Sequence, residues 1–149
     1  RLSKQLGVVV FGKQAEQYAS LFPFPIYPMN YVSNEKELVD IYNAVDLYVT
    51  PSLQDNLPNT IVEAMACGIP CVGFNVGGIP QMIDHLHNGY VAEYQSAKDL
   101  ANGIRWTLTE GEYDNLSEEA CRKALSSYSE SIISMRYIDI YNKITGSHA

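Results

Sequence analysis

The sequence predicts a doubly wound α/β domain, in which helices cover both faces of a parallel sheet and extra helices follow at the C-terminal end. Short apolar runs and helical patterns alternate along nearly the whole chain, which is typical of such a sheet. The 149 residues fit one domain, and 46% of them are hydrophobic, which is enough for a core. The last two predicted helices precede no strand, so we expect them to pack on a sheet face or on another domain.

The first third of the chain is predicted to alternate strand and helix. Its elements are a strand over Leu6–Phe11, a helix over Ala15–Phe22, a strand over Ile26–Val32 and a helix from Ser33 to Val45. The first strand is apolar and β-branched throughout, which suits burial on both faces of a parallel sheet. Pro28 limits the second strand to a short or edge strand, and Ser33 is the expected cap of the second helix.

The remaining elements continue the alternation. They are a strand over Asp46–Thr50, a helix over Pro58–Cys67, a strand over Cys71–Phe74, a short helix over Pro80–Ile83, a strand over Tyr90–Ala92, and helices over Ala97–Thr109, Leu116–Tyr128 and Ser129–Ile144. Gly68 can take the left-handed conformation that ends a helix, and Pro70 prevents its continuation. Gly77-Gly78 predicts a flexible turn, and Ser117 and Ser129 are the expected caps of the last two helices.

Composition and charge narrow the possible partners. The net charge of −7 argues against a nucleic-acid duplex or an anionic membrane as the partner of this domain, although backbone amides can bind a small phosphorylated ligand without a basic surface. No apolar run is long enough to span a bilayer, and the N-terminus lacks a signal-peptide pattern. The three cysteines, Cys67, Cys71 and Cys121, suggest no disulfide framework and no common zinc site, so we expect a reducing, cytoplasmic environment.

The stretch from Asp46 to Gly68, DLYVTPSLQDNLPNTIVEAMACG, is the candidate ligand site. It joins a buried strand to a helix start, and ligands of open α/β sheets bind beyond the carboxyl ends of the strands. The unpaired N–H groups and the dipole at a helix start favour an anion such as a phosphate or diphosphate. The backbone N–H groups expected there are those of Asn56, Leu57, Asn59 and Thr60. The alternative is an ordinary βα loop that binds nothing, with Asp55 or Asn56 as helix cap.

Two carboxylates complete this candidate site, Asp55 in the loop and Glu63 in the helix. A carboxylate can accept two hydrogen bonds from a vicinal diol, so the two acids could hold two sugar rings, one on each side of a phosphate. Glu63 lies among small apolar residues, where a carboxylate usually needs a partner. The alternative makes Glu63 a solvated helix residue.

Three ordered motifs carry a family resemblance. They read Asp55-x7-Glu63, then Ala-Met-Ala-Cys-Gly-Ile-Pro over residues 64–70, then Gly-Gly-Ile-Pro over residues 77–80. With them, Pro51–His85 closely resembles the donor-binding half of GT-B fold glycosyltransferases in the large retaining family GT4, and weaker similarity covers nearly the whole chain. The resemblance implies a Rossmann-like domain, one half of a GT-B fold. It also implies transfer of a sugar, with retention, from a UDP- or GDP-sugar donor to a carbohydrate or lipid-linked acceptor.

The resemblance also implies a role for each candidate residue. Asp55 would hold hydroxyls of the donor sugar, Glu63 would grip the nucleotide ribose, and the amides of Asn56–Thr60 would meet the diphosphate. Backbone contacts to the base are implied for Tyr31, Val32 and Ser33. The leaving group would be stabilised by amides, the helix dipole and basic side chains, with no metal and no cofactor besides the donor substrate.

Two departures from the family pattern matter. The first acid is an Asp where the family has Glu, which shortens its reach. The family domain normally opens with a strand and helix that carry an Arg and a Lys for the diphosphate, and Arg1, Lys4 and Lys13 do not match those positions. We therefore expect residues 1–149 to be a fragment, inactive alone, that lacks the acceptor domain and this first strand and helix. The missing strand would leave a gap at the sheet centre, which neighbouring strands close or another segment fills.

The resemblance further implies surface polysaccharide synthesis at the inner face of a bacterial membrane, with acceptor and peripheral membrane contacts through the missing domain. Two alternatives remain open. One is a non-catalytic nucleotide-sugar-binding or regulatory module, which would keep the ligand without acceptor chemistry. The other is a sugar-nucleotide epimerase of related fold, whose usual catalytic carboxylates and His have no place in this sequence.

Overall fold

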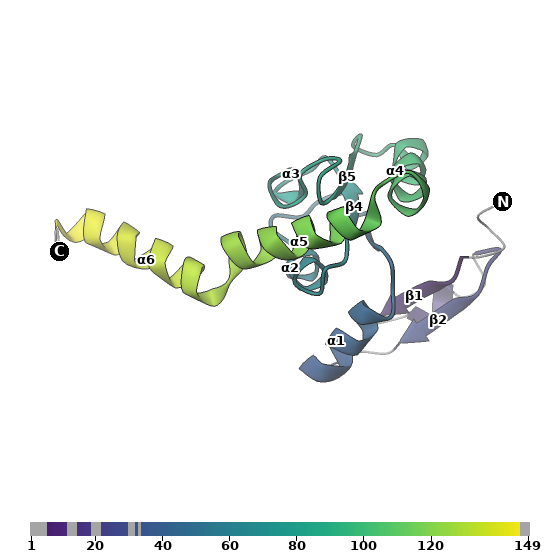
Figure 1. Ribbon diagram of the computed structural model, residues 1–149, viewed down its shortest axis with the longest axis horizontal. Coiled ribbons are helices and arrows are strands. Elements are labelled where there is room, and N and C mark those ends of the chain that lie inside the picture. The colour runs from purple at the N-terminus through teal and green to yellow at the C-terminus, as the bar shows by residue number, and fades with distance from the viewer. Residues whose placement is uncertain (1–5, 12–14, 19–21, 30–31, 33, 147–149) are drawn as a thin grey trace. The chain divides into compact units, whose positions relative to one another are not determined.

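The computed structural model describes residues 6–11, 15–18, 22–29, 32 and 34–146. The chain divides into two compact units, Arg1–Val45 and Asp46–Ala149, and each is described by itself. All strand pairs among the described residues are parallel. They form a two-stranded sheet in the first unit and a three-stranded sheet in the second (Figure 1). The predicted class, an α/β fold with parallel strands and flanking helices, is therefore confirmed.

The first unit pairs two short strands beside a helix. Its elements are β1 (Val8–Phe11), the 3₁₀ turn η2 (Ala15–Tyr18), β2 (Ile26–Met29) and α1 (Glu35–Asn43). Pro28 lies in β2 opposite Val10, as predicted for a short strand, because a strand at a sheet edge tolerates the missing N–H of proline. The ring of Phe11 packs edge-on against Tyr42 of α1, with centroids 5.9 Å apart, and this contact ties the helix to β1.

The cap of α1 differs from the prediction. Asn34 occupies the N-cap position, and its Oδ1 accepts a hydrogen bond from the backbone N–H of Lys36 at 2.9 Å. The predicted cap, Ser33, lies outside the described residues. Asn caps a helix start as well as Ser does, so the sequence pattern left the choice between these neighbours open.

The second unit carries a three-stranded sheet and most of the helices. Its elements are β3 (Tyr48–Thr50), α2 (Asn59–Ala66), β4 (Cys71–Phe74), α3 (Ile79–Met82), β5 (Gly89–Ala92), α4 (Ala97–Thr109), α5 (Tyr113–Tyr128) and α6 (Glu130–Thr145). The strand order is β3-β4-β5, and every residue of the central strand β4 is buried. The predicted boundaries agree with these to within one or two residues, except at the start of α5.

The described strands form two sheets where the sequence predicted one. In a common doubly wound order, the first strand lies between the second strand and the fourth. If β1 is the second strand of that order, as the resemblance implies, the order predicts that β1 pairs with the third strand, β2, and that the fourth strand, β3, pairs with the fifth, β4. Separate pairing of β1 with β2 and of β3 with β4 is consistent with that order. How the predicted gap is closed or filled stays a prediction.

The core of the second unit lies between its sheet and the helices α2, α3 and α4 and continues between α2 and α5. Its large side chains that are at most 2% exposed include Ile61, Met65, Val72, Ile79 and Leu116. Helix α5 lies against α2 of the same unit, whereas the sequence predicted packing on a sheet face or on another domain (Figure 1). The buried residues of α5 are Leu116, Ala120 and Ala124, and the two alanines allow a neighbouring helix to approach closely.

Helix α5 begins one turn earlier than predicted. Its N-cap position is Glu112, and Ser117 lies inside the helix, so the predicted cap at Ser117 is wrong. Asp114 in the first turn explains the earlier start, because a negative charge near a helix N-terminus is stabilised by the dipole. Ser129 occupies the N-cap position of α6 as predicted, although its side chain makes no capping hydrogen bond.

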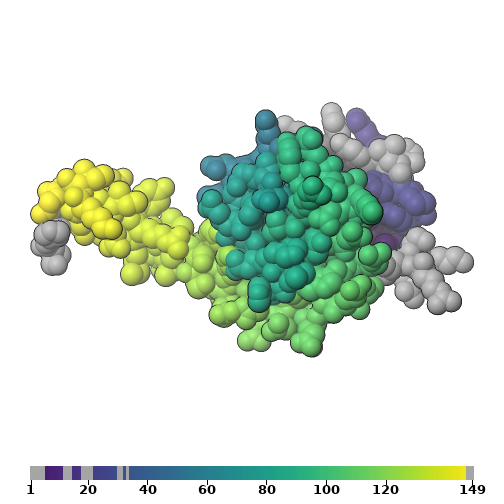
Figure 2. Space-filling model, turned by 90° about the horizontal axis from the view of Figure 1, so that it is seen from above, coloured from purple at the N-terminus to yellow at the C-terminus, as the bar shows by residue number. Residues whose placement is uncertain are grey.

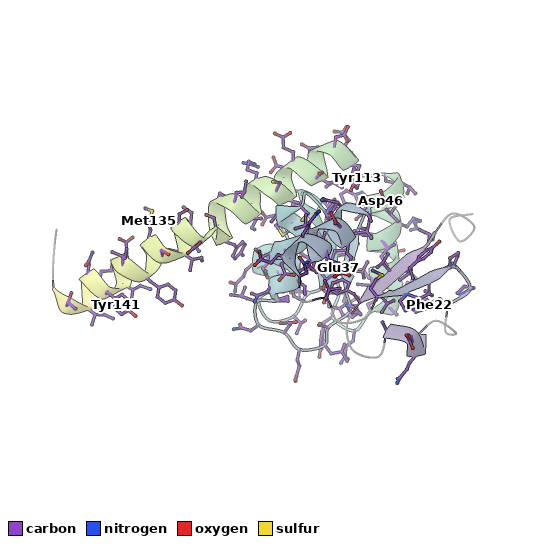
Figure 3. All side chains as sticks on the ribbon, turned by 90° about the horizontal axis from the view of Figure 1, so that it is seen from below. Phe22, Glu37, Asp46, Tyr113, Met135 and Tyr141 are labelled. Carbon is purple, nitrogen blue, oxygen red and sulfur yellow. The ribbon has the colours of Figure 1, made fainter. Side chains whose placement is uncertain are left out.

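Helix α6 extends away from the rest of the second unit (Figure 2). It contains no buried residue, and Met135 and Tyr141 project from it with exposed fractions of 60% and 63% (Figure 3). Most of its large apolar side chains are therefore exposed to solvent within this unit. Among the described helices, none combines the length and apolar character that crossing a bilayer requires.

The three cysteines are free thiols. Cys71 is fully buried in β4, and this burial raises the pKa of its thiol far above the usual range, so it packs as the small hydrophobe that the sequence predicted. Cys67 lies at the end of α2, where Gly68 takes the predicted left-handed conformation with a φ of 73°. Cys67 and Cys121 are half-buried.

Candidate functional site

The loop between β3 and α2, residues 51–58, leads directly into an uncapped helix start. The N-cap position is Pro58, with an extended backbone and no side-chain hydrogen bond. The alternative in which Asp55 or Asn56 caps the helix is therefore wrong. Among the described residues, none accepts a hydrogen bond from the backbone N–H of Asn56, Leu57 or Asn59. This turn can therefore offer backbone donors to an anion.

A tyrosine of β3 fastens this helix start to the sheet. The hydroxyl of Tyr48 donates a hydrogen bond to Oγ1 of Thr60 at 2.8 Å. Burial raises the pKa of Tyr48, and the hydrogen bond with Thr60 opposes that shift. Smaller contributions, all of which raise this pKa, come from Cys71, Glu63 and Asp55. Tyr48 is therefore a neutral hydroxyl within electrostatic reach of both candidate acids.

The two predicted acids lie where the sequence placed them. Asp55 is half-buried in the loop, and Glu63 is half-buried in the second turn of α2. The residues around Glu63 that fill the core are Ile61, Ala64 and Met65. Glu63 consequently lies on the opposite face, one turn after Asn59, and helix geometry tilts its side chain back toward the helix start. Glu63 is thus only partly exposed to solvent, and its role as a ligand residue stays a prediction.

The turn after β4, which contains Gly77 and Gly78, lies in backbone contact with the loop over residues 51–58. A Cβ atom on Gly77 would lie 1.7 Å from the carbonyl oxygen of Asp55, and one on Gly78 would lie 1.9 Å from that of Asn56. Gly77 has a φ of 55°, a conformation that side-chain-bearing residues rarely adopt. The sequence predicted a flexible turn here. The structure shows a turn whose backbone packs against the backbone of the loop.

A second tyrosine contacts the loop from the strand at the opposite edge of the sheet, at the same end of the strands. The hydroxyl of Tyr94, which follows β5, donates a hydrogen bond to the carbonyl oxygen of Leu53 at 3.2 Å. At the start of the loop, the hydroxyl oxygens of Thr50 and Ser52 lie 3.1 Å apart. No local sequence pattern indicated a role for Tyr94, because its contact spans 41 residues. The loop is therefore supported by residues from β3, from the turn after β4 and from the segment after β5.

The residues predicted to contact a base lie in the first unit. Val32 is half-buried after β2, whereas Tyr31 and Ser33 lie outside the described residues. Arg1, Lys4 and Lys13, the basic residues that failed to match the family pattern, also lie outside them. The assignment of a base to this segment stays a prediction.

His85 has a structural role. Its Nδ1 accepts a hydrogen bond from the backbone N–H of Val91 at 3.1 Å, and its ring packs edge-on against Tyr90 with centroids 4.5 Å apart. Nearby, the Nζ of Lys123 lies 2.5 Å from Oδ1 of Asp84. These contacts join the segment before β5 to β5 itself and to α5, so they stabilise the fold.

Comparison with known proteins identifies the family. The sequence model of the family described as glycosyl transferases group 1 matches residues 28–124, which include the loop, both acids and the two glycines. An N,N'-diacetylbacillosaminyl-diphospho-undecaprenol α-1,3-N-acetylgalactosaminyltransferase of Campylobacter jejuni is 30% identical over 117 residues, or 78% of this chain. These residues are 31% of that protein, so the chain spans about a third of this relative.

Solved structures share the fold. The Anabaena protein HepE in complex with UDP-glucose superposes with a TM-score of 0.78 at 19% identity, over 93% of this chain and 41% of that chain. The C-terminal domain of a glycosyl transferase group 1 family protein from Francisella tularensis superposes with a TM-score of 0.65 at 19% identity. That match covers 77% of this chain and 60% of the other. The family match and these folds together show that the chain belongs to the glycosyl transferases group 1 family and has the Rossmann-like fold of a GT-B C-terminal domain.

Proposed function

We propose that this chain binds the nucleotide-diphosphate-sugar donor of a retaining glycosyltransferase, which transfers the sugar to a carbohydrate or lipid-linked acceptor. The observation that carries the proposal is the uncapped start of α2, with one half-buried acid in the loop before it and another in the helix. Backbone donors suit a diphosphate, and carboxylates suit the sugar hydroxyls on either side of it. The UDP-glucose complex of HepE, a protein of the same fold, supports this class of ligand.

Each part of the site takes one portion of the donor in this proposal. The diphosphate meets the backbone amides of Asn56, Leu57, Asn59 and Thr60. Asp55 accepts hydrogen bonds from the donor sugar, and Glu63 accepts them from the ribose. The negative charge that develops on the leaving diphosphate is stabilised by the amides and the dipole of α2, which need no reorganisation during the reaction. The side chain of Asp55 is one methylene shorter than a Glu, which favours a sugar that lies closer to the loop.

The proposal for the whole protein goes beyond this chain. The Campylobacter relative is named for a transfer that involves a diphospho-undecaprenol compound, and this chain corresponds to 31% of its length. We propose that the acceptor, and any membrane surface that carries it, is bound by parts of the protein outside this sequence. A cytoplasmic site of synthesis fits this proposal.

Titration of the complete protein tests the proposal. Calorimetry with UDP-glucose, GDP-mannose and ADP-glucose should identify one donor class that binds. Asp55→Ala and Glu63→Ala should each weaken binding of that donor by about tenfold or more, because each removes hydrogen bonds to a charged acceptor. Glu118→Ala is the matched control, since this acid is exposed on α5, and its donor affinity should equal that of the unmodified protein.

Two results would overturn the assignment. One is the absence of binding for all three donors, and the other is unchanged affinity in both acid variants. A transfer assay then separates an enzyme from a non-catalytic binding module. An enzyme forms glycosylated product from the donor that calorimetry selects, and a module binds the same donor without turnover.

A further inference from the structure

Two glycines that follow β4 lie in backbone contact with the loop that carries Asp55. The Cβ position on Gly77 is 1.7 Å from the Asp55 carbonyl oxygen and 2.9 Å from its carbonyl carbon. The Cβ position on Gly78 is 1.9 Å from the Asn56 carbonyl oxygen and 2.7 Å from Cδ2 of Leu57. Non-bonded heavy atoms make favourable contact at about 3.5–4.0 Å, so both positions exclude any side chain. The nearest obstacles are backbone atoms, and no rotamer change can remove them.

The turn that carries these glycines is the more firmly held partner in this contact. Before it, the N–H of Asn75 donates to the Ala92 carbonyl oxygen of β5 at 2.7 Å, and the N–H of Val76 donates to the Phe74 carbonyl oxygen at 2.9 Å. After it, the first residue of α3, Ile79, is fully buried in the core. Displacement of the turn would therefore disturb the sheet and the core together.

The loop is the weaker partner. Leu53 and Leu57 have exposed fractions of 50% and 46%, so their side chains add little packing to hold the loop in place. The hydrogen bond from Tyr94 holds the loop at Leu53, before the segment that meets the glycines. A Cβ atom on either glycine should consequently push residues 55–57 outward and leave β4 and α3 where they are.

We propose that Gly77 and Gly78 are positioning residues for the donor site. Because they have no side chains, the loop can lie directly against the turn, and this contact sets the position of the Asp55 carboxylate and of the neighbouring amides. This inference rests on the proposed function, since it assigns donor binding to the loop that the glycines support. Neither glycine needs to touch the donor. Their effect passes through the carbonyl groups of Asp55 and Asn56.

Alanine substitutions in the complete protein test this role. Gly77→Ala and Gly78→Ala should each weaken binding of the donor selected by calorimetry by about tenfold or more, because a displacement of about 1 Å is costly in a binding geometry. Gly68→Ala is the matched control. Gly68, which follows the C-terminal end of α2, also has a positive φ of 73°. Its nearest obstacle is the side-chain hydroxyl of Ser117 in α5. That variant should lose stability and keep its donor affinity.

A double variant distinguishes the backbone contact from the side-chain contact. Leu57→Ala removes the Cδ2 atom that a Cβ on Gly78 would meet, but it leaves the Asn56 carbonyl oxygen in place. The pair Gly78→Ala and Leu57→Ala should therefore bind donor as weakly as Gly78→Ala alone. Restored affinity in the double variant would overturn the proposal, because the effect would then belong to the Leu57 side chain.

Crystal structures of the variants give a readout that needs no ligand. The backbone of residues 55–57 should be displaced in Gly77→Ala and Gly78→Ala relative to the unmodified protein, and should keep its place in Gly68→Ala. An undisplaced loop in both glycine variants overturns the positioning role whether or not donor binds. Unchanged donor affinity in both glycine variants of a donor-binding protein overturns it as well, and leaves the proposed function intact. Absence of donor binding in the unmodified protein defeats the proposed function and the assignment of the loop to a donor.

Discussion

At the scale of single residues, the start of α2 depends on a hydroxyl that belongs to the sheet. Tyr48 is part of the apolar run that predicted β3 and is half-buried there, and its hydroxyl donates a hydrogen bond to Thr60 in the first turn of the helix. This bond fixes the first turn of α2 against β3. The amides proposed to bind the diphosphate are therefore held in place by a residue that needs no contact with the ligand.

Substitution of Tyr48 by Phe tests this arrangement. Tyr48→Phe keeps the ring and leaves Oγ1 of Thr60 without this donor, so we expect a loss of about 1 kcal/mol in the free energy of unfolding and weaker donor binding. Urea unfolding and calorimetry measure the two effects. The control is Tyr141→Phe, whose side chain is 63% exposed on α6 and should change neither quantity. Equal stability and equal affinity in Tyr48→Phe would contradict the role.

At the scale of elements, a carboxylate joins the start of α4 to the end of β5. Oδ2 of Asp99 accepts a hydrogen bond from the N–H of Glu93 at 2.8 Å, and Oδ1 accepts one from the Tyr90 hydroxyl at 3.0 Å. The backbone bond from Glu93 is the main cause that lowers the pKa of Asp99, and burial opposes it. Ser96 caps the same turn, with its Oγ 3.2 Å from the N–H of Asp99.

This lowered pKa predicts a pH dependence of stability. The charged Asp99 stabilises the fold above its unfolded pKa of about 3.9, and that contribution is lost as the pH falls through the lower folded value. Asp99→Asn should therefore be less stable than the unmodified chain at neutral pH, and the difference should shrink below about pH 4. Urea unfolding at a series of pH values measures it. A difference that stays constant with pH would show that the charge of Asp99 has no part, and Asp139→Asn, at an exposed residue in the middle of α6, is the control.

The order and type of these elements followed from the sequence because both depend on local patterns. The apolar run of β4 and the left-handed Gly68 were predicted from neighbouring residues alone, as were the positions of Asp55 and Glu63. The hydrogen bond of Tyr94 and the backbone contact of Gly77 depend on segments that lie far apart in the chain, so no local pattern indicated them. Strand pairing is non-local in the same way, so local patterns predicted parallel strands and did not indicate which of the described strands pair with one another.

At the scale of the whole molecule, the helices of the second unit contribute unequally to its stability. Helix α5 buries Leu116, Ala120 and Ala124, whereas α6 buries none of its residues. Exposed apolar side chains gain nothing from folding, because they stay in contact with water. Helix α6 therefore adds length to the unit and little to its core.

Truncation of the chain tests this difference. A chain that ends at Ser129 should keep the free energy of unfolding of the 149-residue chain to within about 0.5 kcal/mol, because it loses no buried side chain. Leu116→Ala, at a buried residue of α5, should lower the free energy of unfolding by about 2–5 kcal/mol. It serves as the positive control, because it shows that the measurement detects a loss of core packing. Urea unfolding followed by circular dichroism gives both values. A truncated chain as unstable as Leu116→Ala would refute the prediction.

The contact between the glycine turn and the loop also bears on how such a sequence can evolve. Leu53 and Gln54 have exposed side chains, so mutation can replace them without altering the path of the backbone. At Gly77 and Gly78 every possible replacement adds at least a Cβ atom, and both positions lack the space for one. Tolerance to mutation should therefore be low at Gly77 and Gly78, although they lie about twenty residues after the proposed ligand contacts in the sequence. In a saturation library scored for donor binding, nearly every replacement at these two positions should reduce binding.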